Sequence, residues 1–190
     1  MRIKDDNKKE AIFEAAIELL NEMGFANISM SKIGKKAGFS SSTIYVYFEN
    51  KEDMLKKVYL DVKEKLRTSL SYGITEALPI RRTVEQIVRN VFAFVMENKQ
   101  YFLFIEQFSN SPLVDDISEA EMDKLFQPFI SIFESGIKEG LLKKTNPVLH
   151  MTYCYQPVSQ VAKAVLKRNI KISEEEMNQI INMSWDAIKA

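Results

Sequence analysis

The stretch AGFSSSTIYVYFENKED, residues 37–53, places three serines and a threonine directly before a helix-like run that contains two tyrosines. Hydroxyl side chains are poor in a helix interior but good at a helix start, where they accept hydrogen bonds from free backbone amides. Ser40 is therefore expected to cap a helix that begins at Ser41. The i, i+4 spacing of Ile44 and Phe48 puts both side chains on the buried face of that helix. Its hydroxyls and tyrosines are left to face outward.

A second short helix is expected before this one. Ser29 is a good N-cap for a helix over residues 30–36, and Gly38 supplies the tight turn that follows. Two short helices joined by a glycine turn form a helix-turn-helix, whose second helix enters the major groove of DNA. Residues 29–51 hold four lysines against one glutamate, although the formal net charge of the chain is zero. The lysines alone are better explained by a solvated helix face, so they do not identify the site.

The remainder of the chain predicts an all-α fold, because its apolar residues recur at three- and four-residue spacing. A first helix is expected from about residue 6 to Met23, with Gly24 at its C-cap. A continuous helix over residues 51–72 is expected to join the N-terminal part to the rest, and Pro128 and Pro157 are expected to kink later helices. These later helices are expected over residues 81–97, 99–109, 117–138, 146–168 and 173–188.

The cysteine content of the chain suits a reducing compartment. The 190 residues contain one cysteine, Cys154, which excludes an intramolecular disulfide. The N-terminal sequence MRIKDDNKKE is charged and does not resemble a signal peptide. No apolar run approaches the roughly 18 residues that a membrane-spanning helix needs. We therefore expect a soluble cytoplasmic protein that does not associate with a membrane.

The segment ISMSKIGKKAGFSSSTIYVYFENKEDML, residues 28–55, resembles the TetR family of bacterial transcriptional regulators. It matches the patterns A-G-[hydrophobic]-S, T-[ILV]-Y-x-Y-F and x-x-K-E-x-[LM] in register, and the resemblance covers roughly residues 8–55. It implies a DNA-binding domain over residues 1–50 and a helical ligand-binding and dimerisation domain over residues 51–190. The protein is then expected to be a homodimeric repressor, released from a palindromic operator by a small effector. We expect no cofactor and no enzymatic activity.

Positions within this motif imply a set of DNA contacts. These are phosphate contacts by Thr43, Tyr47 and Lys51, and base or nearby backbone contacts by Ser31, Ser41, Ser42 and Tyr45. Three positions depart from the family pattern: Ser31 replaces a long side chain, Gly34 an alanine and Val46 a histidine. Glycine weakens a helix by about 1 kcal/mol relative to alanine, and valine suits a thymine methyl group. Because short side chains leave few bidentate base contacts, readout is expected to use DNA shape, water or an arm with Arg2 and Lys4.

The C-terminal part is dense in aromatic residues, which predicts a core or an apolar pocket with few polar anchors. Glu106, within YFLFIEQF, would be costly to bury unless a cationic ligand paired with it. The effector is therefore expected to be hydrophobic and either neutral or cationic. The predicted ligand-binding residues are Phe92, Met96, Phe104, Glu106, Phe108, Phe126, Tyr153 and Gln156.

The last two expected helices have apolar stripes that suit self-association into a two-fold dimer. The predicted dimerisation residues are Val158, Val161, Val165, Ile180 and Met183.

His150 and Cys154 lie four residues apart and share a helix face, as half of a metal site or a thiol beside a base would. No second histidine or cysteine exists to complete a zinc site, so we expect no metal. An all-helical enzyme that uses this pair is one alternative to the regulator. A regulator without a small-molecule effector and a pure interaction module are the others.

Overall fold

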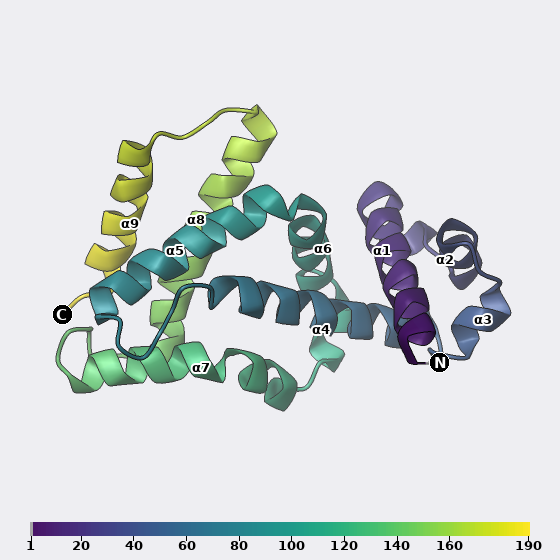
Figure 1. Cartoon of the computed structure of the whole chain (residues 1–190), viewed down its shortest axis with the longest axis horizontal. Coiled ribbons are helices and arrows are strands. Elements are labelled where there is room, and N and C mark those ends of the chain that lie inside the picture. The colour runs from purple at the N-terminus through teal and green to yellow at the C-terminus, as the bar shows by residue number, and fades with distance from the viewer. Residues whose placement is uncertain (1) are drawn as a thin grey trace. The chain divides into compact units, whose positions relative to one another are not determined.

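The structure of this chain, a computed structural model, describes the backbone of residues 2–190 and the side chains from residue 7 onward. No β-strand forms within that range, so the expected all-α fold is confirmed (Figure 1). The side chains of Arg2 and Lys4, the expected DNA arm, lie outside the described side chains. The helices are α1 Arg2–Asn27, α2 Met30–Ala37, α3 Ser41–Tyr45, α4 Lys51–Leu70, α5 Ile80–Glu97, α6 Lys99–Ser109, the 3-10 helix η1 Pro112–Asp116, α7 Glu119–Lys138, α8 Pro147–Arg168 and α9 Glu174–Ile188.

The observed boundaries lie within a few residues of the expected ones, but the end of α1 and the segment before α7 differ in detail. Gly24 breaks α1 with φ +71° and ψ 172°, a conformation open essentially to glycine alone, and one more turn follows it. The helix expected from residue 117 begins at Glu119, and the separate 3-10 helix η1, which begins at Pro112, precedes it. Pro128 lies inside an unbroken α7. None of the described helices is long and apolar enough to cross a membrane.

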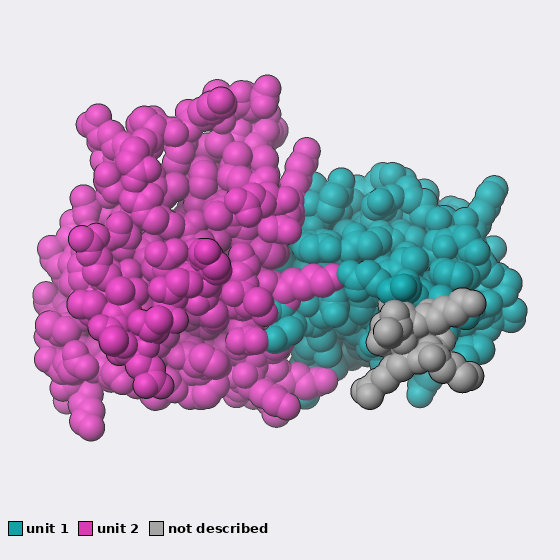
Figure 2. All heavy atoms as spheres, in the orientation of Figure 1, with its two compact units in different colours: residues 1–64, 100–118 teal, residues 65–99, 119–190 magenta. Residues whose placement is uncertain are grey.

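The chain divides by its contacts into two compact units, which Figure 2 colours separately. The N-terminal unit comprises residues 1–64 and 100–118, and the C-terminal unit comprises residues 65–99 and 119–190. Helix α4 therefore begins in the first unit and ends in the second. This division differs from the boundary expected at residue 50, because α6 and η1 belong with the N-terminal helices.

Aromatic and polar contacts fasten α6 into the N-terminal unit. The Asn21 side-chain amide donates to the backbone carbonyl of Gln100 at 2.9 Å, and the Gln107 amide donates to Asn21 at 3.0 Å. Phe108 is fully buried, with its ring stacked on Tyr59 at a centroid distance of 4.2 Å. Because aromatic pairs add to the free energy gained by burial, this cluster anchors α6 to α4.

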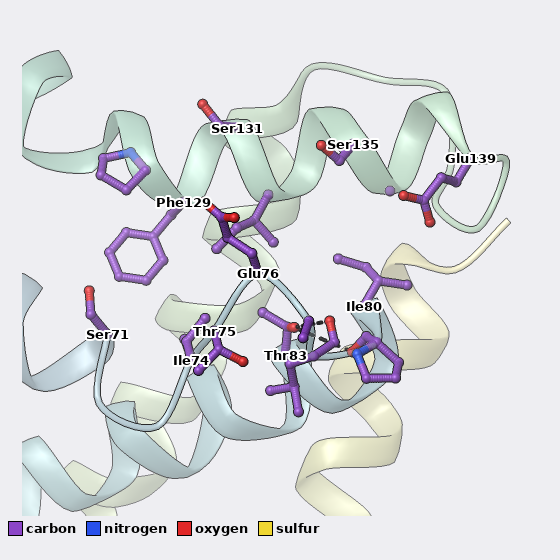
Figure 3. Close-up of a pocket in the computed structure, with 16 residues that line it drawn as sticks. Ser71, Ile74, Thr75, Glu76, Ile80, Thr83, Phe129, Ser131, Ser135 and Glu139 are labelled. Carbon is purple, nitrogen blue, oxygen red and sulfur yellow. Dashed lines mark hydrogen bonds between the residues drawn. The ribbon is translucent and has the colours of Figure 1, made fainter.

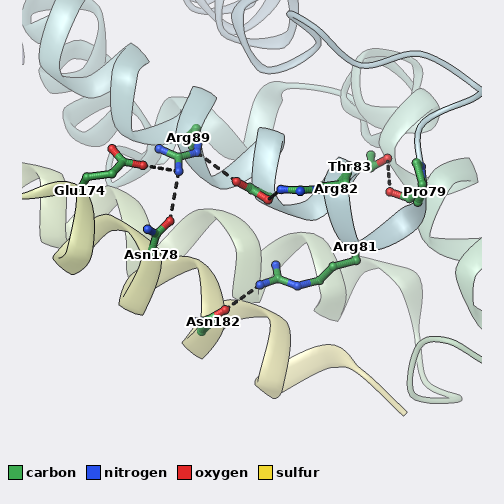
Figure 4. Close-up of polar contacts among 9 residues, drawn as sticks. Pro79, Arg81, Arg82, Thr83, Arg89, Glu174, Asn178 and Asn182 are labelled. Atoms are coloured by element: carbon green, nitrogen blue, oxygen red, sulfur yellow. Dashed lines mark hydrogen bonds and ion pairs between the residues drawn. The ribbon is translucent and has the colours of Figure 1, made fainter.

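The C-terminal unit is built on α5, which packs against α8 and α9, while α7 and α9 also pack against α8. Polar contacts set the register of α5 against α9 (Figure 4). The Arg89 guanidinium donates to Glu174 and, at 3.2 Å, to Asn178. One end of α5 repeats the arrangement, where Arg81 donates to Asn182 at 2.6 Å. Solvent-exposed pairs of this kind add little free energy, so the apolar core provides most of the stability.

Candidate DNA-reading surface and effector cavity

The turn between α2 and α3 has the caps that its sequence predicts. The Ser29 side chain accepts a hydrogen bond from the Lys32 amide at 3.3 Å, and Ser40 accepts one from the Thr43 amide at 3.2 Å. Gly38 has φ +77°, the left-handed conformation that ends α2. These contacts confirm the helix-turn-helix.

Helix α3 buries one side and exposes the other. Ile44 and Phe48 are 0 % and 2 % exposed, and the Phe48 ring lies 5.9 Å from that of Phe13 in α1. Tyr45 is 55 % exposed and Val46, just beyond the helix, is 78 % exposed. The inner side of α3 is thus packed against the core of the N-terminal unit, and its outer side is accessible to a binding partner.

Hydroxyl groups on this surface orient one another. The Ser40 oxygen lies 2.8 Å from the Ser42 oxygen and 2.9 Å from the Thr43 oxygen, each within hydrogen-bond distance. Since a hydroxyl both donates and accepts, Ser40 can cap α3 and still fix its two neighbours. The rotamers of Ser42 and Thr43 are therefore partly set before any DNA is bound.

Lys51 starts α4 beside this surface. Asn50 caps α4 by accepting a hydrogen bond from the Asp53 amide at 2.8 Å. Burial raises the pKa of Asp53, but hydrogen bonds from Lys57 and the Glu49 amide outweigh burial and hold that pKa below its usual value. The ammonium of the half-buried Lys51 has a long ion pair with Glu52 at 3.7 Å, and such a pair adds little free energy.

Two of the four lysines within residues 29–51 have a structural role. Lys36 forms an ion pair with Glu18 of α1 at 2.6 Å, and this hydrogen-bonded contact raises the pKa of Lys36. Lys32 donates to the backbone carbonyl of Asn27 at 2.7 Å. These lysines hold α2 against the end of α1, so the local basic charge is not all directed at DNA.

The C-terminal unit contains a cavity of about 780 Å³ (Figure 3). One wall is the segment between α4 and α5, together with the start of α5, and the other is a face of α7. The Thr83 hydroxyl, 3 % exposed, donates to the carbonyls of Leu78 at 3.2 Å and Pro79 at 3.3 Å and so fixes the first wall to α5. The lining residues are Ser71, Ile74, Thr75, Glu76, Ala77, Leu78, Pro79, Ile80, Thr83, Pro128, Phe129, Ser131, Ile132, Ser135, Gly136 and Glu139.

Comparison with known families covers both units. The family described as "Bacterial regulatory proteins, tetR family" matches residues 12–58, and "Tetracyclin repressor-like, C-terminal domain" matches residues 56–190. The chain belongs to the TetR family. It is therefore a helix-turn-helix transcriptional regulator, in a family of DNA-binding proteins rather than enzymes.

Individual relatives agree with this assignment. An uncharacterized HTH-type transcriptional regulator of Haemophilus influenzae is 24% identical over 189 residues, which is 100% of both chains. The fatty acid metabolism regulator protein of Bacillus subtilis is 25% identical over 133 residues, which is 68% of this chain and 66% of that protein. The crystal structure of a TetR family regulator from Marinobacter aquaeolei has the same fold, with a TM-score of 0.89 at 24% identity over 100% of this chain and 99% of that one. FadR of Bacillus subtilis, solved in complex with stearoyl-CoA, has a TM-score of 0.75 at 20% identity over 92% of this chain and 96% of that one.

The predicted ligand-binding residues of this TetR-family chain do not gather in the cavity, and none of the eight lines it. Phe104, Glu106 and Phe108 belong to the N-terminal unit, where both phenylalanines are core residues. The other five lie in the C-terminal unit and are half-buried or exposed: Phe92, Met96, Phe126, Tyr153 and Gln156. Sequence reasoning missed the cavity because one wall is a connecting segment without hydrophobic periodicity.

The predicted dimerisation residues divide in the same manner. Val158 and Val165 are 0 % and 4 % exposed in the core of the C-terminal unit, so their side chains are not available to a second chain. Ile180 is half-buried, whereas Val161 and Met183 are 37 % and 73 % exposed. The apolar stripe of α8 therefore serves mainly the contacts of α8 with its own unit.

His150 and Cys154 form no recognisable reactive site. Burial raises the pKa of the Cys154 thiol to about 12, whereas a nucleophilic cysteine needs a lowered pKa. His150 is 1 % exposed, and its ring stacks on Phe133 at 5.7 Å. No group of three potential metal ligands occurs among the described residues. The pair is part of the packing between α7 and α8.

Gly34 lets the turn pack closely against α2. A Cβ atom there would lie 2.8 Å from the backbone oxygen of Phe39 and 3.3 Å from Cδ1 of Ile44. Alanine would gain about 1 kcal/mol in helix propensity, but overpacking against backbone costs about 1–3 kcal/mol. We expect Gly34→Ala to lower the free energy of unfolding in urea by about 1 kcal/mol. Ser31→Ala, on the exposed side of α2, is the matched control and should not lower the free energy of unfolding. If Gly34→Ala raised the free energy of unfolding, the turn would be able to move away from α2 to accommodate the methyl group.

His150 should make stability depend on pH. Burial lowers the pKa of His150, so the unfolded chain binds a proton that the folded chain excludes. Stability from this group is complete above the unfolded pKa of about 6.5 and is lost as the pH falls from there, with a slope of at most about 1.4 kcal/mol per pH unit. His150→Phe should flatten the profile between about pH 5 and 7, measured by urea unfolding. Carboxylates such as Glu85, whose pKa the Arg82 hydrogen bond lowers, act at lower pH in both proteins. Identical profiles would refute the assignment.

Proposed function

We propose that this TetR-family regulator is a ligand-responsive repressor. A homodimer would present two copies of α3 to a palindromic operator, and a small hydrophobic effector would release it. The observation that supports this most is the outer surface of α3, where Tyr45 and Val46 are exposed beside the pre-oriented Ser42 and Thr43. A helix so exposed on one side and so well anchored on the other is suited to a DNA groove.

The DNA contacts divide by chemistry. Thr43, Tyr47 and Lys51 would hold phosphates and so position the protein. Short polar side chains and the exposed tyrosine would contact bases or the adjacent backbone, and these are Ser31, Ser41, Ser42 and Tyr45. Val46 has no polar group and is suited to a thymine methyl. Sequence preference would then depend on apolar contacts and DNA shape more than on bidentate hydrogen bonds.

The effector would bind in the cavity between the 71–80 segment and α7. Its volume and its apolar lining are typical of small-molecule sites. FadR of Bacillus subtilis, solved with stearoyl-CoA, supports an effector with a large apolar part. The cavity begins at Ser71, one residue beyond α4, and Lys51 is the first residue of the same helix. The 20 residues of α4 span about 30 Å, so a change at one end can be relayed to the other.

Linkage fixes the energetic consequence of this arrangement. The effector would favour a conformation of α4 in which the distance between the two α3 helices of the dimer does not match the spacing of the operator half-sites. Effector binding would then lower the affinity for DNA, and DNA would lower the affinity for the effector by the same factor. The dimer would use the exposed apolar side chains of the last helices, with Tyr153, Val161 and Met183 among them. The protein would act in the cytoplasm, where its operator is accessible.

The test is selection of bound duplexes from a random DNA library at about 0.15 M salt, a concentration at which purely electrostatic binding is weak. We expect enrichment of a palindrome with half-sites about one helical turn, or a multiple of it, apart. Retention only at low salt, without enrichment, would contradict a sequence-specific repressor. A palindrome that no small molecule displaces would support a regulator without an effector.

A further inference from the structure

We infer that the cavity selects a ligand with a positive charge on an apolar body, such as an ammonium or phosphonium ion with hydrocarbon substituents. This inference rests on the proposed function, in which the same cavity holds the effector. It names the chemical class that the lining residues suit.

The charge of the lining is one-sided. Its only ionisable side chains are the carboxylates of Glu76 and Glu139, and it includes no lysine, arginine or histidine. Glu76 comes from the 71–80 segment and Glu139 from the last part of the α7 wall, so the two walls contribute one carboxylate each (Figure 3). Neither carboxylate forms an ion pair with a lysine or arginine among the described side chains. A bound cation would therefore meet two acidic groups without having to displace a competing base.

Helix ends add smaller charges of both signs. The last turn of α4 precedes Ser71 and the last turn of α7 precedes Glu139, so two helix C-termini, each worth about half a negative charge, adjoin the cavity. The N-terminus of α5 at Ile80 contributes about half a positive charge. This opposing term is smaller than either carboxylate alone. The lining therefore has a net negative charge.

Apolar groups provide the rest of the recognition. Ile74 and Leu78 lie on one wall, and Phe129 and Ile132 lie on the other. Phe129 is 1 % exposed, and Figure 3 shows its ring pointing from α7 toward the opposite segment. Its ring is therefore a packed part of that wall, and the half-buried Ile74, Leu78 and Ile132 provide the accessible apolar surface. A ligand that is both cationic and apolar uses the aliphatic side chains and the carboxylates together.

The same lining disfavours an anionic head group. The phosphates of a coenzyme A thioester would find no basic side chain among the sixteen lining residues and would face two carboxylates. The anionic head group of the stearoyl-CoA in the FadR complex is thus a poor guide to the ligand of this cavity, whereas its apolar chain remains a useful one. The expected difference between the two proteins is in the charge of the effector.

Tetraphenylphosphonium and tetraphenylborate form a matched pair of probes, because they have nearly the same size and shape and opposite charge. Isothermal titration calorimetry on the full-length protein, without DNA, should give an affinity for the phosphonium at least about tenfold higher than for the borate, as expected where one charge sign is favoured. Glu76→Gln combined with Glu139→Gln should remove most of this preference. Glu134→Gln, an exposed position on the same helix outside the cavity, should leave it unchanged.

A blocked cavity locates the binding site. Ser135→Trp places an indole on the lining, and it should abolish phosphonium binding while leaving the helical circular dichroism unchanged. Equal affinity for both ions, or phosphonium binding that survives Ser135→Trp, would overturn the inference. Operator release is a separate readout: phosphonium that binds the cavity without weakening DNA binding would contradict the proposed effector role and leave the charge preference intact.

Discussion

Lys51→Ala should lower operator affinity about 30-fold at 0.15 M salt, because it removes one phosphate contact from each chain of the proposed dimer. Each lost contact retains about 0.9 of a counterion on the DNA, so the slope of log K against log salt should become shallower by about 1.8. If the two proteins bind the operator equally at about 1 M salt, a slope difference of about 1.8 makes their affinities differ about 30-fold at about 0.15 M salt. Electrophoretic mobility shift or fluorescence anisotropy titrations at four or more salt concentrations measure both quantities.

Two further variants separate a phosphate contact from a structural effect. Tyr47→Phe removes a neutral donor, so it should weaken operator binding several-fold without changing the salt slope. Lys144→Ala removes an exposed charge from the C-terminal unit and should change neither quantity. An unchanged slope in Lys51→Ala, or a change of the same size in Lys144→Ala, would show that Lys51 does not hold a phosphate. Urea unfolding of each variant checks that the fold is intact.

The helix-turn-helix could be predicted from sequence because local interactions form it. Ser29, Ser40 and Asn50 accept their hydrogen bonds from amides within three residues, and Gly38 adopts the conformation that only glycine takes easily. Such signals are complete within a short window of sequence. Sequence reasoning treated Gly34 only as a residue that weakens α2. The reason for a glycine there is the close approach of the Phe39 backbone oxygen, which lies beyond the turn and is not evident from the local sequence.

The cavity between the 71–80 segment and α7 could not be predicted, because it depends on which elements meet in three dimensions. Aromatic density in α6 was compatible with a core or a pocket, and Phe104 and Phe108 fill the core of the N-terminal unit. The apolar stripe of α8 indicated a dimer surface, yet α8 packs against α5, α7 and α9, which uses Val158 and Val165 within the chain. Periodicity identifies a buried helix face but does not say whether the same chain or another covers it.

Asn90→Ala should lower the free energy of unfolding by about 2–3 kcal/mol, a large loss for one polar side chain. Asn90 of α5 is 6 % exposed, and its amide donates to the carbonyls of Leu70 at 2.9 Å and Tyr72 at 2.8 Å. The Gln86 amide donates to the Asn90 oxygen at 2.9 Å and holds the side chain in this orientation. Both carbonyls lie at the end of α4, and without Asn90 they lose their donor in a poorly solvated site.

Comparison with two variants tests whether donation is the cause. Asn90→Asp keeps the shape but sets a carboxylate against two carbonyl oxygens, so the protein should be unstable at neutral pH and recover as acid protonates the carboxyl group. Asn182→Ala removes an exposed acceptor of Arg81 on α9 and should cost no more than about 0.5 kcal/mol. Urea unfolding followed by circular dichroism gives all three values. Because Ser71 and the cavity wall directly follow the end of α4, the destabilised Asn90→Ala protein should also lose tetraphenylphosphonium binding. If Asn90→Ala lowers the free energy of unfolding no more than Asn182→Ala does, then water replaces the amide and the two carbonyls need no fixed donor.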